Sequence, residues 1–220
     1  MLRRHSVGLD GADAEFCDLS GRGLSTAQVE RTLRVFDTAV AVDLSNNELE
    51  QVPTTIPKGI VALDVSFNLL ASAFGVERLK VLQELNLGFN RLSDVSVLEY
   101  CPLLRCVNLS GNRLQATRGL ETLVQLERLN LSDNLIEFSD ALRALSLNQR
   151  LTHLTLRGNP LVMKTDSRVL VLDMLPSVLF LDDKKIRAAV KCKTTETLSS
   201  TKSLSYFRLP AFPLSEQDQQ

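Results

Sequence analysis

Hydrophobic and polar residues recur along this chain in one arrangement, with a period close to 22 residues. Aliphatic residues hold the first, fourth, sixth and eleventh places of each copy and asparagine the ninth, as in Leu82, Leu85, Leu87, Asn90 and Leu92. The successive asparagines are Asn47, Asn68, Asn90, Asn112, Asn134 and Asn159. Self-similarity at a period of about 20 to 29 residues is typical of a solenoid built from stacked units.

Each copy contains a short alternating stretch that predicts a strand. The aliphatic residues at the fourth and sixth places should point into the core, and the residues beside them should face outward. We therefore expect an α/β leucine-rich repeat solenoid: a curved, right-handed horseshoe with a parallel concave sheet, short helical or 3-10 convex segments and helical caps. One outward ladder would consist of Asp18, Asp43, Asp64, Asn86, Asn108, Asn130, Thr155 and Asp182.

The pattern divides the chain into a flexible N-terminus (1–14), the repeat domain (15–187) and a Ser/Thr-rich tail with an apolar end (188–220). Within the domain we expect an N-terminal cap repeat (15–38), the repeats (39–161) and a C-terminal cap (162–187).

Helices are expected in both caps. In the first, Ser25 to Gln28 reads as a capping box, and Val29, Leu33 and Phe36 follow on one helical face. In the second, Asp166 would cap a helix over 168–175 that Pro176 ends. The apolar segment 206–214 either folds back onto the repeats or docks on another protein.

The steps of 22 residues resemble the short intracellular subclass of leucine-rich repeat proteins, typified by a regulatory subunit of protein phosphatase 1. The segment after the last asparagine is similar to a C-terminal cap shared by axonemal dynein light chain 1 and the spliceosomal U2 A-prime protein. Ser167 and Asp183 stand where that cap has tyrosine and glycine. The matching residues are Asn159, Pro160, Leu161, Arg168, Leu175, Pro176, Val178, Leu181 and Asp182.

This resemblance covers residues 15–187 and implies a non-catalytic adaptor. It leaves three specific roles open: a regulator of protein phosphatase 1, an axonemal or flagellar light-chain-like component, or a U2 A-prime-like ribonucleoprotein scaffold.

The charge balance and the cysteines indicate which partners and which cellular compartment to expect. The formal net charge is −1, so no basic excess favours direct binding to nucleic acid or membrane. No apolar run reaches the roughly 18 residues of a membrane helix, and the basic start lacks the apolar stretch of a secretory signal. The four cysteines show no C-x-x-C spacing, which favours a reducing compartment. We expect a cytoplasmic location, with a cilium, a flagellum or the nucleus as alternatives.

Catalytic and metal-binding motifs are missing from the sequence, so we expect no enzyme activity, cofactor or metal. Asp18, Asp43 and Asp64 would lie on adjacent strands, where a hard cation is an alternative to a purely structural role. His153 is expected to be a surface histidine. Ser6 lies in an Arg-Arg-x-Ser-aliphatic sequence that fits a basophilic kinase, and phosphorylation there would switch a contact.

The predicted concave face carries charge of opposite sign at its two ends. Acidic residues lie toward the N-terminal half and basic residues toward the C-terminal half, an arrangement that suits a protein partner of complementary polarity. Phe67 and Phe89 hold equivalent places at the edge of the sheet, either as anchors for a partner or packed beneath their own loops. The candidate partner-binding residues are Asp43, Asp64, Phe67, Glu84, Asn86, Phe89, Arg105, Asn108, Arg128, Asn130, His153 and Arg157.

Overall fold

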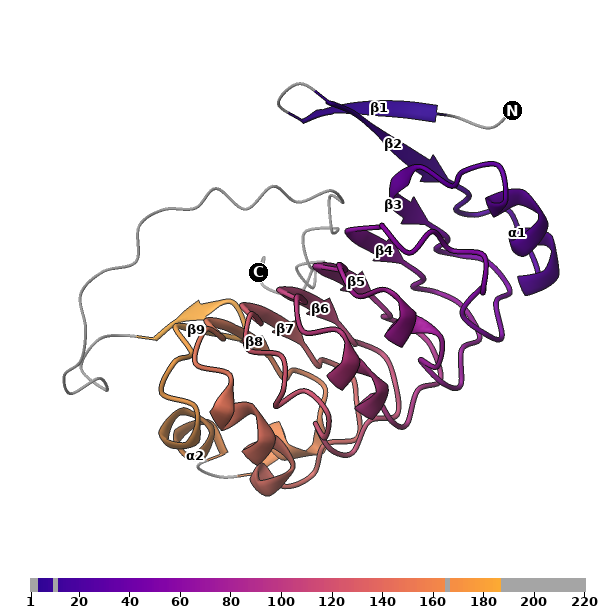
Figure 1. Cartoon of the computed structure of the whole chain (residues 1–220). Coiled ribbons are helices and arrows are strands. Elements are labelled where there is room, and N and C mark those ends of the chain that lie inside the picture. Colours follow the sequence, from indigo (N-terminus) through magenta and orange to yellow (C-terminus); the bar gives the residue numbers. More distant parts are fainter. Residues whose placement is uncertain (1–3, 10–11, 165–166, 187–220) are drawn as a thin grey trace, which may run out of the picture.

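The computed structural model describes residues 4–9, 12–164 and 167–186, and the positions of side chains from Phe16 onward within these ranges. Its strands form one ten-stranded sheet in chain order along the inside of an arc (Figure 1). Neighbouring strands from β2 to β9 are parallel, and the two end pairs are antiparallel. The strands are β1 (Arg4–Leu9), β2 (Ala12–Asp18), β3 (Ala39–Asp43), β4 (Ala62–Asp64), β5 (Glu84–Asn86), β6 (Cys106–Asn108), β7 (Arg128–Asn130), β8 (His153–Thr155), β9 (Phe180–Leu181) and β10 (Lys184–Lys185).

Short helices lie on the outer, convex side of the arc, in several of the connections between strands (Figure 1). They are α1 (Thr26–Leu33), the 3-10 segments η1 (Val76–Arg78), η2 (Ser96–Tyr100), η3 (Ser139–Leu147) and η4 (Pro160–Met163), and α2 (Ser167–Met174). The expected layout of a parallel concave sheet with short helical convex segments is therefore confirmed.

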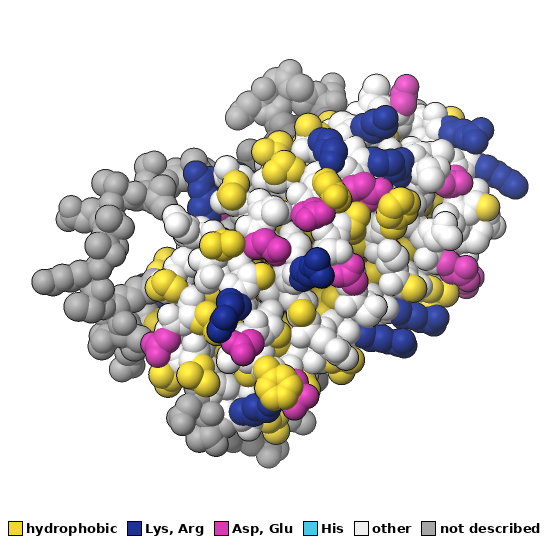
Figure 2. All heavy atoms as spheres, turned by 60° about the horizontal axis from the view of Figure 1, so that its bottom comes forward, with side chains coloured by type: hydrophobic (Ala, Val, Ile, Leu, Met, Phe, Trp, Pro, Cys, Tyr) yellow, Lys and Arg dark blue, Asp and Glu magenta, His cyan; other side chains and the backbone are white. Residues whose placement is uncertain are grey.

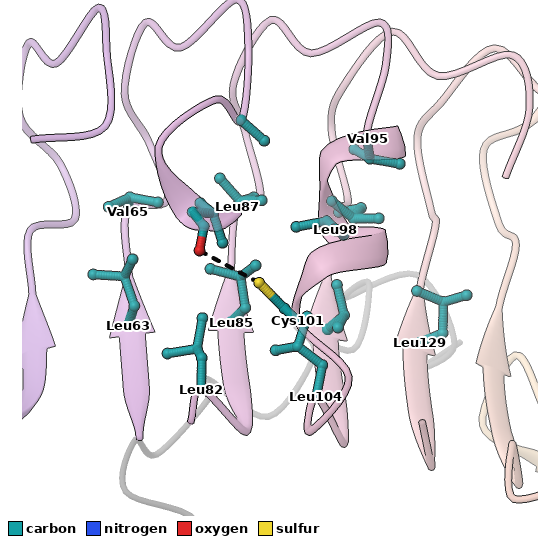
Figure 3. Packing of buried hydrophobic residues seen from close by; sticks show 14 of the residues in the cluster. Leu63, Val65, Leu82, Leu85, Leu87, Val95, Leu98, Cys101, Leu104 and Leu129 are labelled. Carbon is teal, nitrogen blue, oxygen red and sulfur yellow. Dashed lines mark hydrogen bonds between the residues drawn. The ribbon is translucent and has the colours of Figure 1, made fainter. Parts of the chain in front are cut away.

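Aliphatic side chains from every repeat fill the space between the sheet and the convex segments (Figure 3). Leu63, Leu85 and Leu129 hold equivalent places in their strands, and all are at most 2% exposed. Burying each such side chain contributes about 1.5–3 kcal/mol, which is too little for one repeat to offset its own ordering entropy. Stability therefore comes from stacking neighbouring repeats.

The repeated asparagines bind the backbone where each strand turns toward the convex side. In Asn90, Nδ2 donates to the carbonyl oxygens of Val65 and Leu87 at 3.0 and 3.1 Å, and Oδ1 accepts from the Leu70 N–H at 3.0 Å. The other five asparagines make equivalent bonds. Each amide thus satisfies backbone groups that would otherwise be buried without partners.

The caps form largely as the sequence predicts. The Ser25 N–H donates to Gln28 Oε1 at 2.8 Å at the start of α1, and Leu33 on its inner face is buried. In the C-terminal cap, α2 begins one residue before the predicted start and ends before Pro176. The predicted N-cap Asp166 lies outside the described residues.

The sheet extends further toward the N-terminus than the repeated pattern of aliphatic residues and asparagine predicts. We expected no element in residues 1–14, but β1 and the start of β2 form an antiparallel hairpin there, in which Ser6 pairs with Glu15. The apolar segment 206–214 of the tail lies outside the described residues. Among the described helices, none has the length and apolar character needed to cross a membrane.

Candidate functional site

The concave face of the sheet is built from columns of side chains in register. One column joins Glu84, Cys106, Arg128, His153 and Phe180 on β5 to β9. The next is the polar ladder predicted from the sequence, which the strand pairing confirms from Asp18 to Thr155. Because each strand is only a few residues long, a single side chain from every repeat contributes to each column.

The aspartates of the ladder bind the chain that follows their own strands. Asp64 Oδ1 accepts from the Ser66 N–H and Oγ at 2.8 and 2.6 Å, and its Oδ2 accepts from Asn86 Nδ2 at 2.8 Å. Burial raises the pKa of the Asp64 carboxyl. Burial is also the main cause of the raised pKa of Asp43, to which the neighbouring carboxylates add. These bonds give the aspartates a structural role.

No group of three or more His, Cys, Asp or Glu side chains in the described part of the chain is arranged to hold a metal ion. Cys101 and Cys106 are buried free thiols, and Cys17 is also buried. Burial raises the pKa of the Cys101 thiol to about 11, so it remains protonated at neutral pH.

The basic end of the face is more nearly neutral than the sequence suggested. Arg105 pairs with Glu127 at 2.7 Å, and Arg157 lies 3.2 Å from the Asp183 carboxylate and donates to the Asp182 carbonyl at 2.6 Å. Glu127 was not among the residues predicted from the sequence, although Glu127 holds the same place in its repeat as Arg105 does in the preceding one. The predicted contrast between the two ends is therefore reduced by local ion pairing.

A histidine and a phenylalanine stack at the C-terminal end of the face. The rings of His153 and Phe180 lie 4.4 Å apart with an interplanar angle of 8°. Burial, followed by the positive charge of Arg128, lowers the pKa of His153. Phe180 was not among the predicted residues, because it lies in the cap, where the repeat frame is lost.

Phe67 and Phe89 lie where the strands end, and each is about half exposed, at 52% and 46%. Their rings stack at 4.4 Å with an interplanar angle of 9°. The two rings are therefore not packed beneath their own loops, which was one of the two arrangements expected from the sequence. Their exposed rings and the columns of β5 to β9 together make up the candidate site.

The side opposite the candidate site has a mixed surface. In Figure 2, which brings the convex segments forward, Lys and Arg side chains alternate with Asp and Glu, and apolar groups are scattered among them. No large area of one charge is visible on the face shown.

Comparisons with solved structures identify the architecture. The chain matches an internalin of Listeria monocytogenes, InlF, with a TM-score of 0.61 and 17% identity over 76% of this chain and 46% of that one. It matches a leucine-rich repeat protein of Leptospira interrogans with a TM-score of 0.59 and 23% identity over 66% of this chain and 37% of that one. The fold is a leucine-rich repeat solenoid.

A second internalin of Listeria monocytogenes, internalin C2, matches with a TM-score of 0.54 and 16% identity over 76% of this chain and 79% of that one. The leucine-rich repeat array described here spans less than half the length of the first two proteins. No protein-family model matches the sequence, and no curated protein is detectably similar to it.

Proposed function

We propose that this leucine-rich repeat protein is a non-catalytic scaffold or adaptor that binds a partner protein on its concave face. The observation that carries this proposal is the difference between the two sides of the sheet. Helices and turns cover the core side, and no helix of the described residues lies on the concave side (Figure 1). A solvent-facing sheet with side chains in register offers a partner many contacts at fixed spacing.

The chemistry of that face indicates the kind of partner. The partly exposed ladder residues Asn108 and Thr155 are short, so their immobilisation costs little rotamer entropy, and an amide and a hydroxyl can exchange hydrogen bonds with a partner. Arg128 is exposed at one end, and the Asp43 carboxylate lies near the other. An elongated protein segment with the opposite polarity would be held in one orientation.

The narrower form of this proposal places the protein among regulators of protein phosphatase 1, axonemal or flagellar light-chain-like components, or U2 A-prime-like scaffolds. Its support is the asparagine spacing and the cap, where Val178 and Leu181 are buried after Pro176. We also propose a cytoplasmic location, or one in a cilium, a flagellum or the nucleus, supported by the free thiols of Cys101 and Cys106.

Affinity purification from cells of the source organism tests the proposed face. The concave variant Arg128→Glu with His153→Glu should lose at least about tenfold of the captured partner, because two exposed contacts are reversed or removed, equivalent to about 1.4 kcal/mol or more. The convex control is Arg118→Glu with Arg143→Glu, which changes two exposed arginines on the other side. The control should capture as much partner as the wild type. Equal capture by both variants would refute the choice of face.

A further inference from the structure

One column of residues along the ends of the strands has a left-handed backbone in repeat after repeat. It consists of Asn46, Phe67, Phe89, Gly111, Asp133 and Gly158, with φ between 53° and 71°. Glycine, asparagine and aspartate adopt this conformation readily, whereas a bulky residue there is an outlier that costs about 1–2 kcal/mol. The two phenylalanines are therefore the unexpected members of the column.

The packing of the fold does not offset the backbone cost of placing phenylalanine at these two positions. Their stack, with ring centroids 4.4 Å apart, offsets only part of the backbone cost, about 0.5–1.5 kcal/mol. Roughly half of each side chain stays in contact with solvent. The outer face of the Phe89 ring lies against Gly111, where a Cβ would be only 2.6 Å from Cδ1. We call Phe67, Phe89 and Gly111 the aromatic step. Backbone strain that keeps aromatic surface exposed points to a binding role.

We propose that the aromatic step is the docking site of the chain's own C-terminal segment 206–214, Tyr-Phe-Arg-Leu-Pro-Ala-Phe-Pro-Leu. This segment supplies three aromatic rings to stack on the step, and its two prolines lower the entropy lost on binding. Its single charged residue, Arg208, lies between the aromatic and aliphatic groups.

The length of the intervening chain fits this site. The last described residue, Ile186, follows the β9–β10 hairpin, and β5 lies four strand spacings from β9. Four spacings of about 4.8 Å amount to roughly 20 Å. Nineteen residues, 187–205, connect Ile186 to the segment. A random coil of that length has a root-mean-square span of about 24 Å. Effective concentration is greatest when span and distance match, and reaches the millimolar range. Even a weak contact would then be well populated.

Hydrogen exchange measured by mass spectrometry on the full chain tests the proposal. For a contact of about 0.1 mM affinity at millimolar effective concentration, the backbone amides of 206–214 should exchange about tenfold more slowly than in an undocked chain. In Phe67→Asn with Phe89→Asn this protection should disappear. Asparagine is the residue at position 46 of the same column, so the melting temperature should not fall.

The matched control is Phe74→Asn, which changes a phenylalanine that is 73% exposed and lies outside the column. In this variant the amides of 206–214 should exchange at the wild-type rate. As a second variant, Phe207→Ser with Phe212→Ser alters the tail alone and should also lose the protection. Equal exchange in the wild type and both double variants would overturn the proposal. Protection that rises with protein concentration would overturn it too, since it would indicate the tail of a second copy. Partner capture measured in parallel keeps a failure here distinct from a failure of the proposed function.

Discussion

The ring of Phe89 lies close to Gly111, in the space that a side chain at position 111 would enter. A Cβ built there would approach Cδ1 and Cε1 of Phe89 to 2.6 and 3.0 Å. Real carbon atoms do not come this close, so either the ring or the backbone would have to move. The position of the aromatic ring on the surface thus depends on the identity of a residue in the next repeat.

Replacing Gly111 with alanine should therefore destabilise the protein and displace the Phe89 ring. The matched control is Gly23→Ala, because Gly23 has φ +61°, close to the +62° of Gly111, but has nothing within 4 Å of a built Cβ. Both variants incur the strain of alanine at positive φ, about 1 kcal/mol. Gly111→Ala should lose about 2–4 kcal/mol in total, because overpacking of about 1–3 kcal/mol adds to the strain. Urea unfolding measures both values, and equal losses in the two variants would contradict the contact.

The helical caps close the two ends of the array, where a repeat has a neighbour on one side only. In α1, Val29 and Leu33 cover the first repeats, and both are at most 1% exposed. In a linear array each element contacts its neighbours, so damage to a cap should spread only over the nearest strands before the whole array unfolds.

Leu33→Ala should loosen the N-terminal end and leave the C-terminal end intact. Truncating a buried leucine costs about 2–5 kcal/mol, and that loss should appear as faster hydrogen exchange in β2 and β3 with unchanged exchange in β7 and β8. Arg31→Ala, on the exposed face of the same helix, serves as the control and should change neither end. Uniform acceleration in all strands would show instead that the array unfolds as a single unit.

Elements that share the repeat frame were predictable from the sequence, and those outside it were not. The frame located the strands and the role of Asn90, because core spacing and a buried amide leave few alternatives. The β1–β2 hairpin was missed because residues 4–15 lack the frame. The stacking of Phe89 depends on its positive φ and on Gly111, which a hydrophobic pattern does not reveal. The ion pair between Arg105 and Glu127 could be predicted only by comparing residues one repeat apart, because the two are not neighbours in sequence.

The whole molecule is one curved sheet with two different sides. The convex side is occupied by the connecting segments, and its visible charges are mixed in sign (Figures 1 and 2). The concave side gathers one residue from each repeat into columns, so a substitution in any repeat alters one part of a continuous surface. Under the proposed function, inward residues hold the array together, and exposed outward residues such as Arg128 and His153 are available for contact with a partner.

Site-specific photo-cross-linking in cells tests this division most directly. A photoreactive phenylalanine analogue at position 132 or 153 lies on the concave side, and one at position 118 or 143 lies on the convex side. Our account predicts that one protein partner is cross-linked from both concave positions and from neither convex position. Cross-linking of that partner from 118 and 143 but not from 132 and 153 would contradict it.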